Sequence, residues 1–459
     1  MIERGAVLIQ RAGANALDDW PVSAVSTVAA TLLVHRPESV MPITMRISLR
    51  RLVALFGTLL VASVAFEQAQ ASEVLSLDRA LQTAIANNPE LAAARWEVEI
   101  AQGARQQAGL IPNPVLTLDA EDTRRDSRTT AIKLSQTLEL GGKRGARIDV
   151  ASRGQDAVDL ELQRRRNLLR ADVIEAFYAA LRAQERSQLA ERSQALAERG
   201  LNVAQGRVSA GKASPVEAAR AQVQVSQMRL ELNRAHRDQD NAYRRLATVS
   251  GASSVGFSAV QAPLQVPPAL PATAALLARL EQTVELRLAE MAIVQGEAAL
   301  GLEKSQRIPD LDISLGSQYD ASARERVNLV GLSMPIPLFN RNQGNVLSAA
   351  RRADQARDLR NAAELRLRGE TRDALDQWAT AENEVQSFNR VILPAAQNAV
   401  DSATRGFQMG KFNFLEVLDA QRTLIDARSQ YLMALAQTTE AWVRIERIYG
   451  DLTALDRTL

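Results

Sequence analysis

The chain has 459 residues, no cysteine and two histidines, and its 55 basic and 53 acidic side chains leave a formal charge of +2. This near-neutral balance disfavours nucleic acid as a partner, and the shortage of thiol and imidazole ligands disfavours a built-in zinc or copper site. We therefore expect no cofactor, no metal centre and no catalytic site. Long stretches rich in Ala, Leu, Arg, Gln and Glu are typical of long helices and coiled coils.

The beginning of the chain has the pattern of a secretion signal. From Met45, three arginines precede an apolar run over residues 52–66, and the small-x-small sequence AQA ends at Ala71. A basic segment, an apolar segment and such an ending predict a signal peptide over 45–71 that is cut after Ala71. The apolar run is short for a membrane span of about 20 residues. Residues 1–44 are interpreted as an upstream extension, so the start at Met1 or at Met45 stays open.

The rest of the sequence repeats itself. IPNPVLTLD at 111–119 matches IPDLDISLG at 308–316, and AGKASPVEAARAQ at 210–222 matches MGKFNFLEVLDAQ at 409–421. Self-similarity at a fixed spacing indicates duplicated structural units. We therefore expect a first repeat over 72–251 and a second over 272–459, joined by a Pro-rich linker over 252–271.

Each repeat shows the same order of periodicities. The first predicts a helix over about 76–110, strands over about 115–122 and 129–140, a long helix over about 143–206, a turn near 206–213 and a returning helix that ends at Gly251. The second predicts a helix over 272–306, strands over about 310–320 and 326–338, a helix over about 344–406, a turn near 406–413 and a returning helix to Gly450. Sixty-odd helical residues make a rod of roughly 95 Å.

The first turn contains GRVSAGKAS at 206–214, which resembles a phosphate-binding loop. Ala213 stands where such a loop needs the hydroxyl that holds Mg²⁺, and a similar stretch, GFQMGKFNF, recurs in the second repeat. A hairpin tip explains the recurrence better than a nucleotide site does. A nucleotide-binding enzyme is therefore the least favoured reading, to be tested by nucleotide binding that Lys212→Ala abolishes.

The four strands alternate apolar and polar residues, and four are too few to close a barrel. Open strand edges are prohibitive in lipid, where nothing pairs with the backbone. If the strands face lipid, the protein must pool strands with copies of itself, and three copies would give twelve. The alternative is a soluble periplasmic coiled-coil adaptor or scaffold with a small sheet. Cell fractionation separates the two readings.

Several motifs resemble the TolC-like outer-membrane factor family, and the resemblance extends from Ser72 to Leu459. They are LSLDRAL at 75–81, NNPEL at 87–91, GLIPNP at 109–114, LELGGKRGAR at 138–147 and LEVLDAQ at 415–421. The resemblance implies a mainly α fold with a small β part: long antiparallel coiled-coil hairpins and four strands per chain. It implies a homotrimer with a 12-stranded outer-membrane barrel continued by a periplasmic α-barrel.

The resemblance also implies a function. It is strongest for the branch that serves Czc-type cobalt, zinc and cadmium efflux, which implies a passive duct, not an enzyme. Its expected partners are a periplasmic adaptor, an inner-membrane RND-type pump and outer-membrane lipid. Drugs, or polypeptides of type I secretion, are the alternative cargo of the same duct.

The family narrows its periplasmic aperture with a D-x-x-D pattern that matches Glu416 and Asp419, and the equivalent carboxylate of the first repeat is Glu217. Residues three apart share a helix face, so three copies would place six carboxylates around one axis. An ordinary solvated acidic face is the alternative. The arginine that holds the aperture closed in the family is replaced here by Phe412. The sequence therefore does not show how the aperture of this chain is held closed.

The residues expected at the hairpin tips are the candidates for adaptor docking. Phe412 and Phe414 could instead pack under the turn. The set is Gly206, Gly211, Lys212, Gly410, Lys411, Phe412 and Phe414.

Overall fold

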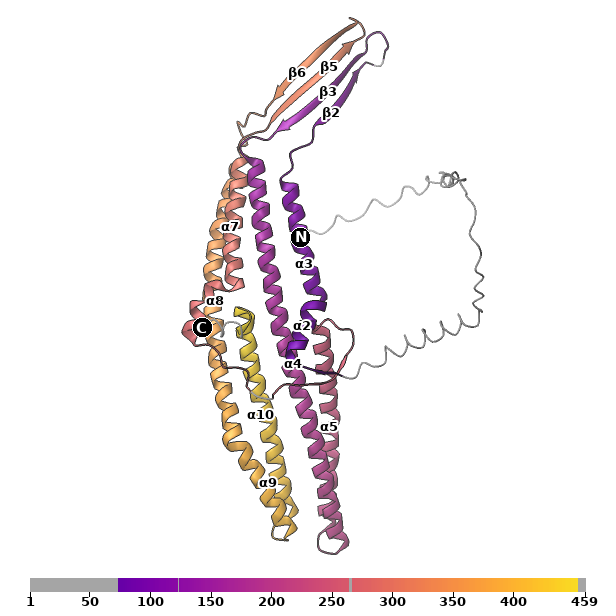
Figure 1. Cartoon of the computed structure of the whole chain (residues 1–459), viewed down its shortest axis with the longest axis vertical. Helices are drawn as coiled ribbons and strands as arrows, with labels where there is room; N and C mark the ends of the chain where they lie inside the picture. The colour runs from indigo at the N-terminus through magenta and orange to yellow at the C-terminus, as the bar shows by residue number, and fades with distance from the viewer. Residues whose placement is uncertain (1–72, 123, 264–265, 453–459) are drawn as a thin grey trace, which may run out of the picture. The chain divides into compact units, whose positions relative to one another are not determined.

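Long helices dominate the computed structural model, which describes residues 73–122, 124–263 and 266–452. The expected extension over 1–44 and signal peptide over 45–71 lie outside the described residues. Helix α4 (Lys143–Ser209) and helix α5 (Pro215–Val249) form the first hairpin. Helix α8 (Gln343–Ser387), α9 (Leu393–Gln408) and α10 (Phe414–Tyr449) form the second, and both hairpins lie lengthwise beside each other in Figure 1.

The sequence pattern predicts one uninterrupted α-helix over about 344–406. The structure differs, because a π-helical turn η2 (Phe388–Ile392) separates α8 from α9. Pro394 is the second residue after this turn, in the first turn of α9. Proline has no backbone N–H to donate to the preceding turn, and a wider turn accommodates that loss. No helix in the described part of the chain combines the length and the apolar character needed to cross a membrane.

The helix expected over 76–110 is also broken, into α2 (Leu77–Asn87) and α3 (Pro89–Ala108). Asn88 lies between them, and its side-chain oxygen accepts a hydrogen bond from the Leu91 N–H at 3.0 Å. Its side-chain nitrogen donates to the carbonyl of Val249 at 3.2 Å. The NNP sequence therefore ends one helix, caps the next and ties both to the end of α5.

The segment expected as a helix over 272–306 is likewise divided, into α6 (Thr273–Ala278), a 3₁₀ turn η1 (Leu280–Gln282) and α7 (Val284–Ser305). Two short strands that the sequence pattern did not predict precede it along the chain. β1 (Glu73–Leu75) pairs in parallel with β4 (Phe257–Val260). The described residues thus contain two strands more than the four expected.

The main sheet has four antiparallel strands in the order β2 (Val115–Glu121), β3 (Thr129–Leu138), β5 (Leu311–Asp320) and β6 (Glu325–Ser333). The two central strands come from different repeats, and β2 and β6 form the edges. Leu116, Leu134, Leu315 and Val330 stand in one cross-strand row.

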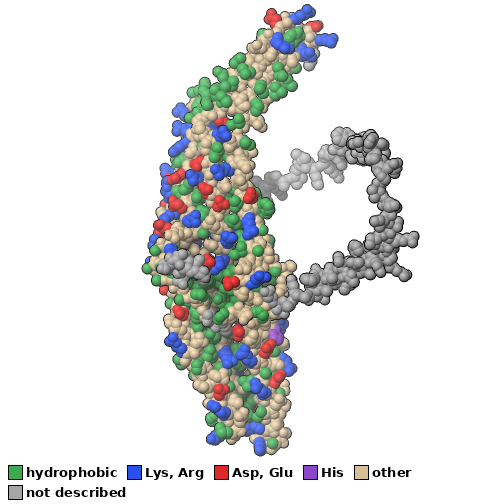
Figure 2. All heavy atoms as spheres, viewed as in Figure 1, with side chains coloured by type: hydrophobic (Ala, Val, Ile, Leu, Met, Phe, Trp, Pro, Cys, Tyr) green, Lys and Arg blue, Asp and Glu red, His purple; other side chains and the backbone are tan. Residues whose placement is uncertain are grey.

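Because side chains alternate along each strand, this row defines an apolar face. The same face holds Leu118, Ile132, Ile313, Tyr319 and Leu332, and the other face holds Asp119, Lys133, Ser135, Asp312 and Gln318, with Val115, Val327 and Leu329 among them. Hydrophobic side chains cover much of this sheet in Figure 2. The sheet is therefore amphipathic, and its apolar face is exposed in the single chain.

The sheet meets the helices at a corner built from GGKR. Gly141 and Gly142 have φ of 71° and 73°. A Cβ on Gly141 would lie 2.8 Å from both the Ile308 Cβ and the Ser305 carbonyl oxygen. The Lys143 ammonium lies 2.6 Å from the Asp310 carboxylate, which joins the first repeat to the second. The glycine pair thus forms the corner between strand β3 and helix α4, and the lysine that follows it is held in an ion pair.

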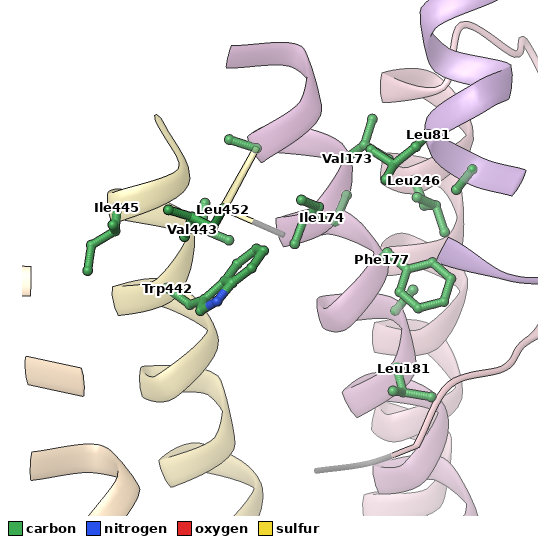
Figure 3. Close-up of a cluster of buried hydrophobic side chains, with 14 of the residues drawn as sticks. Leu81, Val173, Ile174, Phe177, Leu181, Leu246, Trp442, Val443, Ile445 and Leu452 are labelled. Carbon is green, nitrogen blue, oxygen red and sulfur yellow. The ribbon is translucent and has the colours of Figure 1, made fainter. Parts of the chain in front are cut away.

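The largest hydrophobic core lies where α2, α4, α5 and α10 meet. Figure 3 shows α4 between its neighbours, with Phe177 facing the side of Leu246 and Trp442 of α10 pointing toward Ile174. These four side chains are buried. The core therefore joins the middle of α4 to the C-terminal ends of α5 and α10.

One carboxylate is fully enclosed beside this core. Glu446 is 0% exposed, and its carboxylate accepts a hydrogen bond from the Arg170 guanidinium at 2.5 Å and another from the Leu452 N–H at 3.0 Å. Burial raises the pKa of Glu446, and the Arg170 hydrogen bond opposes that rise. Arg170 also binds Asp451 at 2.8 Å. The end of α10 is thereby fixed to α4 by charge as well as by packing.

The glycine corner yields a prediction with a built-in control. Gly141→Ala should lower the free energy of unfolding by about 1–3 kcal/mol more than Gly142→Ala does. Both substitutions put a side chain at positive φ, but only the first pushes a Cβ into Ile308 and Ser305, whereas nothing lies within 4 Å of a Cβ on Gly142. Denaturant titration of both variants in detergent micelles measures the difference. Equal losses would contradict the steric explanation.

Candidate functional site at the hairpin tips

The two hairpin tips share one backbone geometry. Gly211 and Gly410 have φ of 69° and 72°. The following lysine N–H donates at 2.8 Å to the carbonyl five residues earlier in both turns, from Lys212 to Arg207 and from Lys411 to Gly406. These bonds satisfy carbonyls that the helix end leaves free, and glycine provides the left-handed residue. Each GK sequence therefore ends one helix and reverses the chain.

The helix that follows each turn has its own side-chain cap. The Ser214 hydroxyl accepts from the Val216 N–H at 3.3 Å, and the Asn413 side chain accepts from the Glu416 N–H at 3.1 Å. Serine and asparagine are favoured at this position for that reason. The GK sequence thus lies between two helices, whereas a phosphate-binding loop follows a strand.

Gly206 corrects the expected tip. It lies inside α4, which continues to Ser209, and a Cβ on it would meet nothing within 4 Å. The hydrogen bonds of the two turns instead make Arg207 the equivalent of Gly406. Gly406 needs its small size, because a Cβ there would lie 2.2 Å from the Phe412 ring. Gly206 therefore lies one residue before the position that corresponds to Gly406.

The tip aromatics have different surroundings. Phe414 is 4% exposed and belongs to a small core with Phe407 and Ala204, while Phe412 folds against Gly406 and stays 44% exposed. The Phe407 and Phe414 ring centroids are 5.7 Å apart. Phe414 therefore packs under the turn and is not available to a docking partner in the single chain, which corrects its expected role in docking. Lys212 and Lys411 are exposed, as are both turn glycines.

Two contacts between the hairpins involve residues that the sequence pattern did not single out. The Arg207 guanidinium carbon lies 4.7 Å from the centre of the Phe407 ring. Higher along the hairpins, the Arg422 guanidinium donates to the Gln224 side chain at 3.3 Å. Arg207 lies in α4 and Phe407 in α9, so these contacts join α4 to α9 and α10 to α5. Their only sequence signal is proximity to the GK turns.

The three candidate gate carboxylates are not equivalent. Glu416 and Asp419 lie three residues apart on the first turns of α10, and both are exposed. Glu217 lies in the first turn of α5 and is partly buried, and its Oε1 has no hydrogen-bond partner among the described residues. The structure thus brings Glu416 and Asp419 onto one helix face and leaves Glu217 on the neighbouring hairpin.

Asp419 also lines a groove of about 570 Å³ between α5 and α10. Its walls combine apolar side chains with two guanidinium groups, and the lining includes Val216, Arg220, Val223, Leu415 and Arg422. Among the described residues, no cluster of three or more His, Cys, Asp or Glu side chains has the arrangement needed to hold a metal ion.

Comparison with known proteins supports this fold. The model of the outer membrane efflux protein family matches residues 80–252 and 278–451. The cobalt-zinc-cadmium resistance protein CzcC of Cupriavidus metallidurans is 39% identical over 83% of this chain and 91% of its own. The nickel-cobalt-cadmium resistance protein NccC of Alcaligenes xylosoxydans xylosoxydans is 28% identical over 80% of this chain and 87% of its own.

Two solved structures show the same architecture at low sequence identity. The open-state outer-membrane channel MtrE of Neisseria gonorrhoeae superposes with a TM-score of 0.69 at 19% identity, covering 81% of this chain and 88% of its own. CusC superposes with a TM-score of 0.68 at 19% identity, covering 82% and 91%. The expected fold class, long helical hairpins with a small sheet, is confirmed. With its duplicated hairpins, amphipathic sheet and family match over most of its length, this chain belongs to the outer membrane efflux protein family.

Proposed function

We propose that this chain is the outer-membrane subunit of a tripartite efflux system and forms a passive duct for divalent cations such as cobalt, zinc and cadmium. The observation that supports the cargo is the 39% identity to a cobalt-zinc-cadmium resistance protein over most of both chains. The duct is supported by the amphipathic sheet and its two unpaired edges.

The sheet can line a pore only together with the sheets of other copies of the chain. β2 and β6 have one neighbour each within the described sheet, so each leaves a row of backbone groups without partners. Lipid offers those groups no hydrogen bonds, and pairing β2 of one copy with β6 of the next satisfies them. Three copies of a four-stranded sheet make a twelve-stranded barrel, which leaves room for water. The apolar face then meets lipid and the polar face lines the lumen.

The polar face suits cations. Its charged side chains are five carboxylates and one ammonium: Asp119, Glu121, Asp312, Asp320, Glu325 and Lys133. Three copies would present fifteen carboxylates and three ammonium groups to the lumen. A pore lined mainly by one sign of charge concentrates ions of the opposite sign.

The helices near the sheet support the same assembly. α3 packs on α4, α4 on α7, and α7 on α8, so α3 and α8 are the outer members of this layer. Both expose large apolar side chains: Trp96 and Ile100 on α3, and Leu347, Leu359 and Leu365 on α8. A neighbouring copy that continues the layer would cover them. We infer a homotrimer in which α3 of one copy contacts α8 of the next.

This contact can be tested with one residue. Trp96 is 69% exposed in the single chain, and Trp96→Glu would place an unpaired carboxylate in the proposed interface. We expect a loss on the order of 2–4 kcal/mol at each contact. The fraction of trimer, measured by light scattering in detergent, should fall sharply. Gln102→Glu puts the same charge elsewhere on α3 and should leave the trimer intact, and equal effects would count against this interface.

The tips are proposed to dock a periplasmic adaptor, which connects the duct to an inner-membrane RND-type pump that supplies energy. Lys212, Lys411 and Phe412 are the exposed tip side chains that support docking. Phe414 is excluded by its burial. Outer-membrane lipid is the remaining proposed partner.

At the same tips, Glu416 and Asp419 are proposed to form the acidic gate, with Glu217 nearby on α5. Glu416→Gln with Asp419→Asn keeps the side-chain size and removes two charges per chain. Block of single-channel current by divalent cations should weaken by roughly tenfold or more, because six fewer carboxylates surround the axis. Planar-bilayer recordings measure the block. Glu90→Gln with Glu99→Gln removes the same charge on α3, and a gate variant that behaves like this control would refute the placement.

Gene deletion tests the proposed cargo. The deleted strain should become more sensitive to cobalt, zinc and cadmium on graded plates, and the wild-type chain supplied from a plasmid should restore growth. Copper and detergents serve as comparison compounds. Sensitivity to detergents alone would assign the duct to drugs, and no change with any metal would overturn the cation cargo.

A further inference from the structure

The turns between β2 and β3 and between β5 and β6 lie at one end of the sheet, here called the turn end. Acidic and basic side chains at this end lie on opposite faces of the sheet. Glu121, Asp320 and Glu325 stand in one cross-strand row on the polar face. Arg326 is one residue further along β6 than Glu325 and therefore points to the apolar face. Arg128 directly precedes β3, and its carbonyl accepts a hydrogen bond from the Ala321 N–H as a further rung of the ladder. Continued alternation therefore places Arg128 on the same face as Thr130. Basic side chains thus border the apolar face, and acidic side chains border the polar face.

Arg128 and Arg326 lie at the same end of the sheet, next to or within strands β3 and β6, which β5 separates. The Ala321 N–H donates to the Arg128 carbonyl at 3.0 Å, so the two turns of the sheet are joined side by side. Arg326 stands directly opposite Tyr319, and Tyr319 opposite Thr130. A tyrosine with an arginine opposite it at the end of an apolar band is typical of a boundary between hydrocarbon and lipid headgroups. Figure 2 shows charged side chains gathered at this end of the sheet.

The chain itself does not neutralise these two arginines. Both are exposed, and neither forms an ion pair with another described residue, whereas Arg124 of the same turn is bound by Asp122 at 2.9 Å. The nearest row of carboxylates is on the opposite face of the sheet, where strand geometry keeps it. A guanidinium at the rim of an apolar surface is best satisfied by an oxyanion that accepts two parallel N–H bonds.

We propose that Arg128 and Arg326 form a binding surface for the phosphate groups of an anionic lipid in the membrane leaflet that the turn end of the sheet reaches. The acyl chains lie along the Leu315 and Val330 row, and the phosphate meets the guanidinium groups. A homotrimer has six such arginines around its rim. This inference rests on the proposed membrane-inserted duct.

Two double variants test the surface. Arg128→Gln with Arg326→Gln removes two charges from the apolar rim. Arg124→Gln with Arg125→Gln removes two charges from the turn between β2 and β3 at the same end of the sheet. Purified trimers of each are titrated with diphosphorylated lipid A in detergent, and trimer dissociation on heating is followed. The rim variant should need about ten- to thirtyfold more lipid for the same protection, while the control stays within about twofold of wild type.

Dephosphorylated lipid A and inorganic phosphate complete the test. The inference predicts that neither protects the wild-type trimer as the phosphorylated lipid does. Equal protection by both lipids, or an equal response of rim variant and wild type, would overturn it, and protection by inorganic phosphate would replace the lipid with a free anion. If the wild-type trimer inserts into membranes but lipid A does not raise its resistance to heat, the lipid-binding surface is refuted and the proposed duct is not. If the chain never inserts into membranes, both proposals are refuted.

Discussion

Unpaired backbone groups on the edge strands β2 and β6 are the constraint on which the rest of this architecture depends. A four-stranded amphipathic sheet cannot leave those edges open against lipid, because each unsatisfied N–H or C=O there costs several kcal/mol. The helices share the same two open sides. α3 is the element before β2 along the chain and α8 is the element after β6, so the outer helices of the layer are connected to the outer strands of the sheet. The proposed association of copies would therefore satisfy the backbone groups of the edge strands and cover the exposed Trp96.

Packing along the hairpins is uneven. Near the middle, a large core and the enclosed Glu446 with Arg170 join α4 to α10. At the tips, the hairpins share a small core, a cation–π contact worth about 0.5–1 kcal/mol at exposed sites, and a single side-chain hydrogen bond to Gln224. Regions held by few buried contacts open at lower free energy than the core does. The tips are thus the parts of each hairpin that can separate while the middle stays intact.

Local periodicity was enough to predict the rods, the four long strands and the duplication, because alternation and helical spacing are properties of contiguous residues. It could not predict β1 with β4, because that pairing joins segments far apart in the chain. It also missed the break at Asn88, where a distant carbonyl and a local cap act together. At the tips, the repeated GK pattern indicated the turns, but the placement of Gly206 and the burial of Phe414 depend on how two hairpins meet.

The alternation that makes the sheet amphipathic also keeps its charges apart. Neighbours in sequence such as Glu325 and Arg326 point to opposite faces and cannot neutralise each other across the sheet. The carboxylates therefore retain their field on the polar face, and the arginines retain theirs on the apolar rim. A field of this kind selects by sign and not by metal, and no described cluster has the ligand set to coordinate one.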